Sequence, residues 1–71
     1  MNRIKYIRTE IFKLQMSEFA AIAGVSQATV SKWENDIHEP NLSALTRIRD
    51  EAAKRGLSFE DSVFFEQRVA S

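Results

Sequence analysis

The sequence predicts an all-α domain built from five short helices. Apolar residues recur at spacings of three and four, and no strand-like alternation extends beyond a few residues. Glycine, serine, asparagine and proline separate these segments at the places where helices usually begin and end. With 71 residues and no cysteine, the chain can bury one core and has no disulfide or thiolate metal site. We therefore expect one compact domain over residues 1–71.

The first helix is predicted over residues 2–12 and the second over residues 16–23. Three isoleucines form the apolar stripe of the first helix: Ile4, Ile7 and Ile11. Tyr6 and Phe12 flank this stripe. Three residues share the inner face of the second helix: Phe19, Ala20 and Ala23. Both helices are therefore expected to contribute one face to the core.

Gly24 ends the second helix, because the residue after a helix usually takes the left-handed conformation that glycine adopts without a Cβ clash. Ser26 follows as the N-cap of a third helix over residues 27–34. Asn41 caps a fourth helix over residues 42–54. Its predicted inner stripe consists of Leu42, Leu45, Ile48 and Ala52. Gly56 ends this helix.

A fifth helix is predicted over residues 59–68, with Ser58 as its N-cap and acidic residues in its first turn. Its apolar residues are too many for one face of one helix. Some of them close the core, and four are expected to form a dimer interface: Phe59, Val63, Phe64 and Phe65. Residues 57–71 are therefore a candidate dimerisation segment, the alternative being that all of these side chains pack within the monomer.

The third predicted helix has two chemically different sides. At about 100° per residue, Val30 and Trp33 point one way. The other side carries small residues, amides and one cation: Gln27, Ala28, Ser31, Lys32 and Asn35. No acidic residue interrupts that side, whereas helices exposed only to water usually mix Glu with Lys. This pattern favours a surface that approaches base edges closely.

The second and third predicted helices, joined by a tight turn, form the helix-turn-helix arrangement, in which the second helix enters the major groove. Residues 17–48, SEFAAIAGVSQATVSKWENDIHEPNLSALTRI, resemble the lambda-repressor-like (Cro/C1, or XRE-type) helix-turn-helix family. The matching residues are Phe19-Ala20, Gly24-Val25-Ser26, Thr29-Val30-Ser31, Trp33-Glu34, Pro40, Leu42, Leu45 and Ile48. The resemblance implies a five-helix fold with the helix-turn-helix at about residues 16–34, and binding to double-stranded DNA.

The resemblance also implies roles for individual residues. Base contacts fall on Gln27, Ala28, Ser31 and Lys32. Their chemistry agrees, because glutamine bonds to adenine, lysine donates to guanine and the alanine methyl contacts the thymine methyl. Glu34 matches an acidic residue that pairs with a basic residue of the first helix, and Arg8 is the expected partner.

Phosphate contacts are expected from Lys13, Ser17, Asn35, His38 and Asn41. The sequence departs from the family at the start of the second helix, where the usual Thr-Gln pair is replaced by Gln15-Met16. Because Met16 cannot donate a hydrogen bond to phosphate, Ser17, Lys13 and free backbone N–H groups are expected to take that place.

The net charge is zero, but it is unevenly distributed along the chain. Residues 1–32 carry five Lys/Arg against two Asp/Glu, whereas residues 33–71 carry five against eight. A polyanion responds to the local field of the face it meets. The asymmetry is equally compatible with an ordinary solvated surface, so charge alone does not decide between a DNA-binding protein and any other.

Other functional classes find little support in the sequence. His38 is the only histidine, and no convergent ligands or nucleophile–base set accompany it, so we expect no enzyme, metal, cofactor or small-molecule substrate. No apolar run approaches the roughly 20 residues of a membrane span, and no signal peptide is apparent, so we expect a cytoplasmic protein without membrane contact.

Two hypotheses about function remain. The first is a sequence-specific transcriptional regulator, a small dimeric repressor of phage or prokaryotic type that binds a pseudo-palindromic operator. The alternative is an antitoxin-type or other protein-interaction module on the same fold, which binds a partner protein through its C-terminal segment. The acid-free side of the third helix favours DNA binding in either case.

Overall fold

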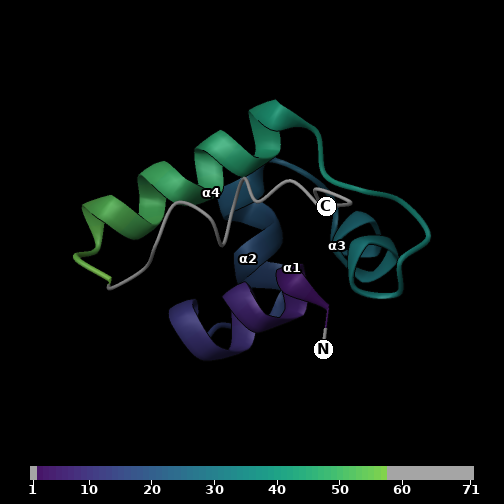
Figure 1. Ribbon diagram of the computed structural model, residues 1–71, viewed down its shortest axis with the longest axis horizontal. Coiled ribbons are helices and arrows are strands. Elements are labelled where there is room, and N and C mark those ends of the chain that lie inside the picture. The colour runs from purple at the N-terminus through teal and green to yellow at the C-terminus, as the bar shows by residue number, and fades with distance from the viewer. Residues whose placement is uncertain (1, 58–71) are drawn as a thin grey trace, which may run out of the picture.

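The computed structural model describes residues 2–57, which fold as helices around one core (Figure 1). The elements are α1 (Arg3–Tyr6), the π-helix η1 (Ile7–Phe12), α2 (Met16–Ala23), α3 (Gln27–Glu34) and α4 (Leu42–Lys54). Residues 2–57 contain no strand, so the predicted all-α class is confirmed. The predicted fifth helix and its cap Ser58 lie outside the described residues. None of the helices from α1 to α4 has the length and apolar content that crossing a membrane requires.

The core draws side chains from every helical element. Its buried residues are Ile4, Ile7, Phe12, Phe19, Ala20, Ala23, Val30, Trp33, Ala44, Leu45, Ile48 and Ala52. The rings of Phe12 and Phe19 pack edge to face, with centroids 5.6 Å apart, which joins η1 to α2. Figure 1 shows α4 along one side of the molecule, with α2 beneath it and α3 at one end. Because Val30 and Trp33 belong to this core, the core holds α3 in place.

The first predicted helix changes its winding midway. After α1 the chain continues as a π-helix, and the Lys13 N–H donates to the Arg8 carbonyl five residues back. Residues five apart then share a face, so Ile7 and Phe12 both enter the core. Ile11 is only partly buried. Ile11 still packs against the core, so its place in the apolar stripe is confirmed, whereas the prediction that Phe12 only flanks the stripe was wrong.

The inner face of α4 also differs from the prediction at one position. Leu42 is 68% exposed, whereas Ala44 is buried. Ala44, Ile48 and Ala52 recur every four residues and define the buried face, which leaves Leu42 outside it. The prediction for Leu42 was therefore wrong, while the predicted burial of Leu45, Ile48 and Ala52 is confirmed.

The predicted helix ends are confirmed where the structure describes them. The Ser26 hydroxyl accepts a hydrogen bond from the Thr29 N–H at 3.1 Å, and the Asn41 side-chain oxygen accepts one from the Ala44 N–H at 2.8 Å. Gly24 ends α2 with a φ of +76°, in the left-handed region that glycine tolerates best. The helix-turn-helix therefore occupies residues 16–34 as predicted.

Candidate nucleic-acid interface

α3 is fixed to the core by one side and leaves the other in solvent. Val30 and Trp33 are 0% and 4% exposed, which confirms the predicted inner side. The opposite side carries Gln27, Ala28 and Lys32, which are exposed, and Ser31, which is partly buried. We call these four residues the outer arc of α3. Their contact with bases stays a prediction, but all four lie on one accessible face.

The N-terminal end of α3 is held by its cap. Besides accepting from the Thr29 N–H, the Ser26 hydroxyl lies 2.9 Å from the Thr29 hydroxyl, so the first turn of α3 is closed by two contacts. Gln27 and Ala28 belong to this turn. Because these contacts fix the backbone of the turn, they also fix the backbone positions of the first two residues of the outer arc.

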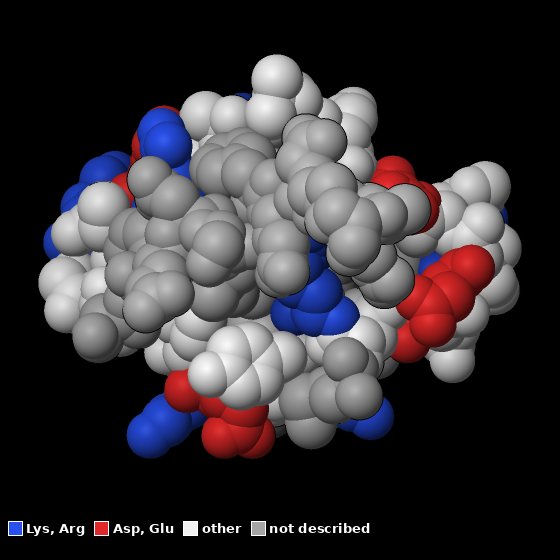
Figure 2. Space-filling model, in the orientation of Figure 1, with Lys and Arg blue, Asp and Glu red and all other residues white. Residues whose placement is uncertain are grey.

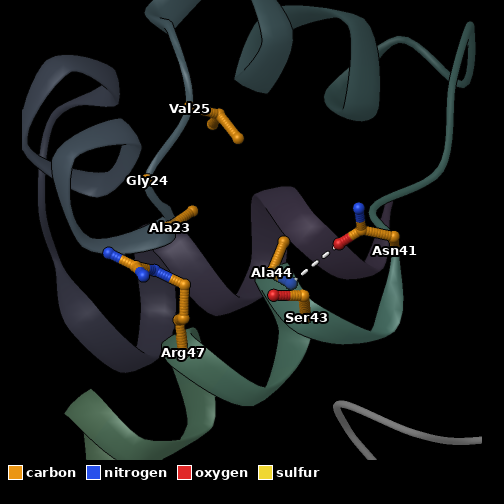
Figure 3. Close-up of a pocket in the computed structure, with 7 residues that line it drawn as sticks. All are labelled: Ala23, Gly24, Val25, Asn41, Ser43, Ala44 and Arg47. Carbon is orange, nitrogen blue, oxygen red and sulfur yellow. Dashed lines mark hydrogen bonds between the residues drawn. The ribbon is translucent and has the colours of Figure 1, made fainter.

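The turn before α3 packs against α4 through Arg47, which is not among the site residues predicted from the sequence. The Arg47 Nε donates to the Ile22 carbonyl at 3.4 Å, and a Cβ on Gly24 would meet this Nε at 3.0 Å. Figure 3 shows the Arg47 side chain beside Gly24, at the edge of a shallow pocket of about 230 Å³. Glycine at this position therefore serves the left-handed turn and leaves room for the end of the Arg47 side chain.

The C-terminal end of α3 closes as a Schellman motif. The Ile37 N–H donates to the Lys32 carbonyl at 2.9 Å, and the Asp36 N–H to the Trp33 carbonyl at 3.2 Å. Asp36 sits in the left-handed region, with a φ of +59°. The Asn35 amide donates to the Ser31 carbonyl at 2.8 Å. The carbonyls of Ser31, Lys32 and Trp33, in the last turn of α3, are thus satisfied within the protein.

The predicted pair between Arg8 and Glu34 is present and nearly buried. The Arg8 Nε donates to Glu34 Oε2 at 2.6 Å, and its Nη2 donates to Oε1 at 3.1 Å. The side chains are 13% and 4% exposed. The hydrogen bond with Glu34 raises the pKa of Arg8 above its ordinary value, so the guanidinium remains charged. This pair anchors the last residue of α3 to η1.

The residues predicted to contact phosphate all lie at the surface: Lys13, Ser17, Asn35, His38 and Asn41. Lys13 and Ser17 lie where η1 gives way to α2, and the other three lie between the end of α3 and the start of α4. The structure therefore groups them at the two ends of the helix-turn-helix. Their contacts with DNA stay a prediction.

The departure from the family at Met16 has a structural explanation. Met16, the first residue of α2, is partly buried, and its side chain packs against the hydrophobic core. Gln15, which precedes it, is exposed at the N-cap, and its N–H donates to Glu18 Oε1 at 3.1 Å. Glu18 thus closes the start of α2, an interaction that was not predicted from the sequence.

Charged side chains of both signs are interspersed over the described surface. Residues 2–57 contain nine Lys/Arg and seven Asp/Glu. Figure 2 shows side chains of both signs on one face, and acidic side chains gather at the end of the molecule where Figure 1 places α3. A DNA-binding face would therefore depend on the local composition of the outer arc, which contains no acid, more than on a field of one sign.

Comparison with known families agrees with this geometry. A family profile described as helix-turn-helix matches residues 4–58, which spans all of the described helices except the first residue of α1. No curated protein and no solved structure gave a significant match to the chain. The matched segment covers well over half of the sequence and contains the turn, the cap and the outer arc. The chain belongs to the Cro/C1-type, XRE-like helix-turn-helix family of DNA-binding regulators.

Proposed function

We propose that the protein is a sequence-specific transcriptional regulator, a small dimeric repressor that binds a pseudo-palindromic operator in double-stranded DNA. One observation carries this proposal: the outer arc of α3 is accessible and free of acid, while α3 is fastened at both ends and along its inner side. A rigid helix with small polar side chains is what direct reading of the major groove requires.

The outer arc supplies the base-reading groups in this proposal. Gln27 presents an amide that can bond bidentately to adenine, and Lys32 presents an ammonium that donates to guanine. Ala28 lies beside Gln27 with only a methyl group, which permits close approach and contact with a thymine methyl. Ser31 is small enough to let the helix backbone come near the base edges.

Phosphate contacts at the two ends of the helix-turn-helix would set the depth and register of α3 in the groove. Lys13 and Ser17 hold one backbone strand from the start of α2. Asn35, His38 and Asn41 hold the other from the α3–α4 connection. This division is supported by their exposure at the two ends of the helix-turn-helix.

Dimerisation is assigned to residues 57–71, through Phe59, Val63, Phe64 and Phe65. Apart from Leu57, these residues lie outside the described part of the chain, and the proposal rests on their apolar character. Two copies of α3 would then read half-sites about one helical turn, roughly 34 Å, apart.

Selection of bound sites from random duplex DNA tests the proposal directly, because it yields the half-site and the spacing together. Gln27→Ala and Lys32→Ala should each relax the preference at one or two base pairs. Lys54→Ala is the matched control, since its side chain lies at the end of α4 that Figure 1 shows farthest from α3. If the protein binds the recovered sites no more tightly than random duplex at moderate salt, specific regulation is excluded.

Sedimentation of the purified protein at tens of micromolar tests the dimer separately. We expect a dimer that Phe64→Asp or Phe65→Asp converts to monomer. A monomer in the unmodified protein, unchanged by either substitution, would contradict the assignment of residues 57–71.

A further inference from the structure

Asn2 connects the start of α1 to the end of α3 through its side-chain amide. Its Oδ1 accepts from the Ile4 N–H at 2.8 Å and from the Lys5 N–H at 3.2 Å, which makes it the N-cap of α1. Its Nδ2 donates to the Trp33 carbonyl at 3.0 Å and to Asp36 Oδ1 at 2.7 Å. Both amide hydrogens therefore go to the end of α3.

These four contacts fix the orientation of the amide. Turning it over would place the NH₂ group against two N–H donors and the carbonyl oxygen against two acceptors. Asparagine is therefore the residue that fits, because aspartate and serine cap a helix equally well but cannot donate two hydrogen bonds from the same position.

Asp36, to which Asn2 bonds, has a backbone conformation that is unusual for a residue other than glycine. Asp36 occupies the left-handed position after α3, where glycine is the common residue because it has no Cβ. The Asp36 carboxylate gives this position an acceptor that glycine lacks, and Asn2 bonds to it. The same Asn2 nitrogen bonds to the Trp33 carbonyl, which also accepts from the Asp36 N–H at 3.2 Å. The turn and its brace are thus one connected unit.

We propose that Asn2 is a positioning residue for base reading: it holds the C-terminal turn of α3 in the orientation in which the outer arc meets DNA. This inference rests on the proposed function. Asn2 would contact no DNA itself. It acts through Trp33, which follows Lys32, and through Asp36, which follows Asn35.

Three substitutions separate capping from positioning. Asn2→Ser keeps the cap of α1, adds no charge and loses the bonds to α3. Asn2→Ala loses both. Asn2→Asp keeps the cap but places a second carboxylate against that of Asp36, which repels it. The double variant, Asn2→Asp with Asp36→Asn, restores a donor–acceptor pair with the roles reversed, because the amide at position 36 now donates to the carboxylate at position 2.

Amide hydrogen exchange in the free protein is the first measurement. In Asn2→Ser, exchange at Asp36 and Ile37 should accelerate about five- to tenfold, the effect expected for the loss of about one net hydrogen bond. Exchange at Tyr6, whose N–H donates to the Asn2 carbonyl at 2.9 Å, should change only in Asn2→Ala. The double variant, Asn2→Asp with Asp36→Asn, should recover most of the protection that Asn2→Asp loses. Unchanged exchange at Asp36 and Ile37 in Asn2→Ser overturns the inference.

Affinity for a selected-site duplex and for random duplex is the second measurement. Asn2→Ser should lower the ratio of the two affinities about five- to tenfold, the equivalent of weakening one base contact, and the reversed pair should restore it in part. An unchanged ratio despite faster exchange also overturns the inference. If the unmodified protein shows no preference between the duplexes, the proposed function fails, and positioning for base reading fails with it. The exchange data then still show whether Asn2 holds the end of α3.

Discussion

Arg8 binds Glu34 through two parallel hydrogen bonds, a fork that joins the π-helix to the last residue of the helix-turn-helix. The third guanidinium nitrogen, Nη1, donates to the Leu14 carbonyl at 3.0 Å. One side chain therefore ties together η1, the loop before α2 and the end of α3. Because the pKa of Arg8 is raised by Glu34, the contribution of the charged guanidinium to stability is present at neutral pH and is lost, as the pH rises, only in strong alkali.

Arg8→Ala should cost about 3–5 kcal/mol in the free energy of unfolding, because it leaves the nearly buried Glu34 carboxylate without a partner. Arg8→Lys should cost less, since it keeps the charge but cannot form the fork. Urea unfolding measures both. Replacing the two residues together, as Arg8→Met with Glu34→Leu, should recover most of the loss. A lysine variant as stable as the unmodified protein would show that the fork geometry contributes nothing.

Much of this fold could be predicted from local chemistry. The residues that begin and end helices interact only with neighbours three or four positions away, so their roles can be predicted from the local sequence. They are Ser26, Asn41, Gly24 and Gly56. The burial of Val30 and Trp33 follows from helical periodicity in the same way. The Arg8–Glu34 pair was predicted through the resemblance to a family, because nothing local joins residues 26 apart.

The features that escaped prediction depend on tertiary packing. Periodicity at 3.6 residues per turn places Phe12 beside the apolar stripe, but the π-helix shifts the register so that Phe12 is buried against Phe19. Asn2 was predicted only as the start of a helix, since its bond to Asp36 spans 34 positions and requires the fold to exist. The left-handed backbone of Asp36 likewise has no glycine to signal it.

Comparison of Gly24 with Gly56 separates the cost of a left-handed backbone from the cost of a steric contact made by an added Cβ. Both have positive φ, at +76° and +69°, but a Cβ on Gly24 would meet Arg47, whereas one on Gly56 meets nothing within 4 Å. Each glycine-to-alanine change should cost about 1–2 kcal/mol for the left-handed backbone. Gly24→Ala should cost only slightly more in thermal or urea unfolding, because the Arg47 side chain is exposed and can move. A much larger cost at Gly24, relieved by Arg47→Ala, would show that Arg47 is rigidly held.

Glu51 makes part of the stability of α4 dependent on pH. Its carboxylate accepts from Arg55 Nε at 2.8 Å, and this bond lowers the pKa of Glu51 below its ordinary value of 4.5. A lowered pKa in the folded state stabilises the protein above pH 4.5, and that contribution is lost as the pH falls through the lower folded value. Glu51→Gln should therefore be less stable than the unmodified protein at neutral pH and equal to it in acid. Unfolding curves that keep a constant separation throughout would contradict this.

Lys13 offers a test in which stability and DNA binding should move in opposite directions. It ends the π-helix with a φ of +57°, a left-handed conformation that costs a lysine about 1–2 kcal/mol. Lys13→Gly relieves this strain, but glycine also has more conformational entropy to lose on folding, which offsets part of the gain. The free energy of unfolding should therefore stay unchanged or rise by up to about 1 kcal/mol.

The same change removes the cation proposed to contact phosphate. Affinity for selected and random duplexes should therefore fall by the same factor, and the slope of log affinity against log salt should decrease by about 1. Lys13→Ala is the control, because it loses the charge but keeps a Cβ in the left-handed backbone. Both variants should bind DNA equally weakly, while only the glycine variant matches or exceeds the stability of the unmodified protein. If Lys13→Gly instead changes the base preference and leaves the salt slope intact, Lys13 positions α3 and does not bind phosphate.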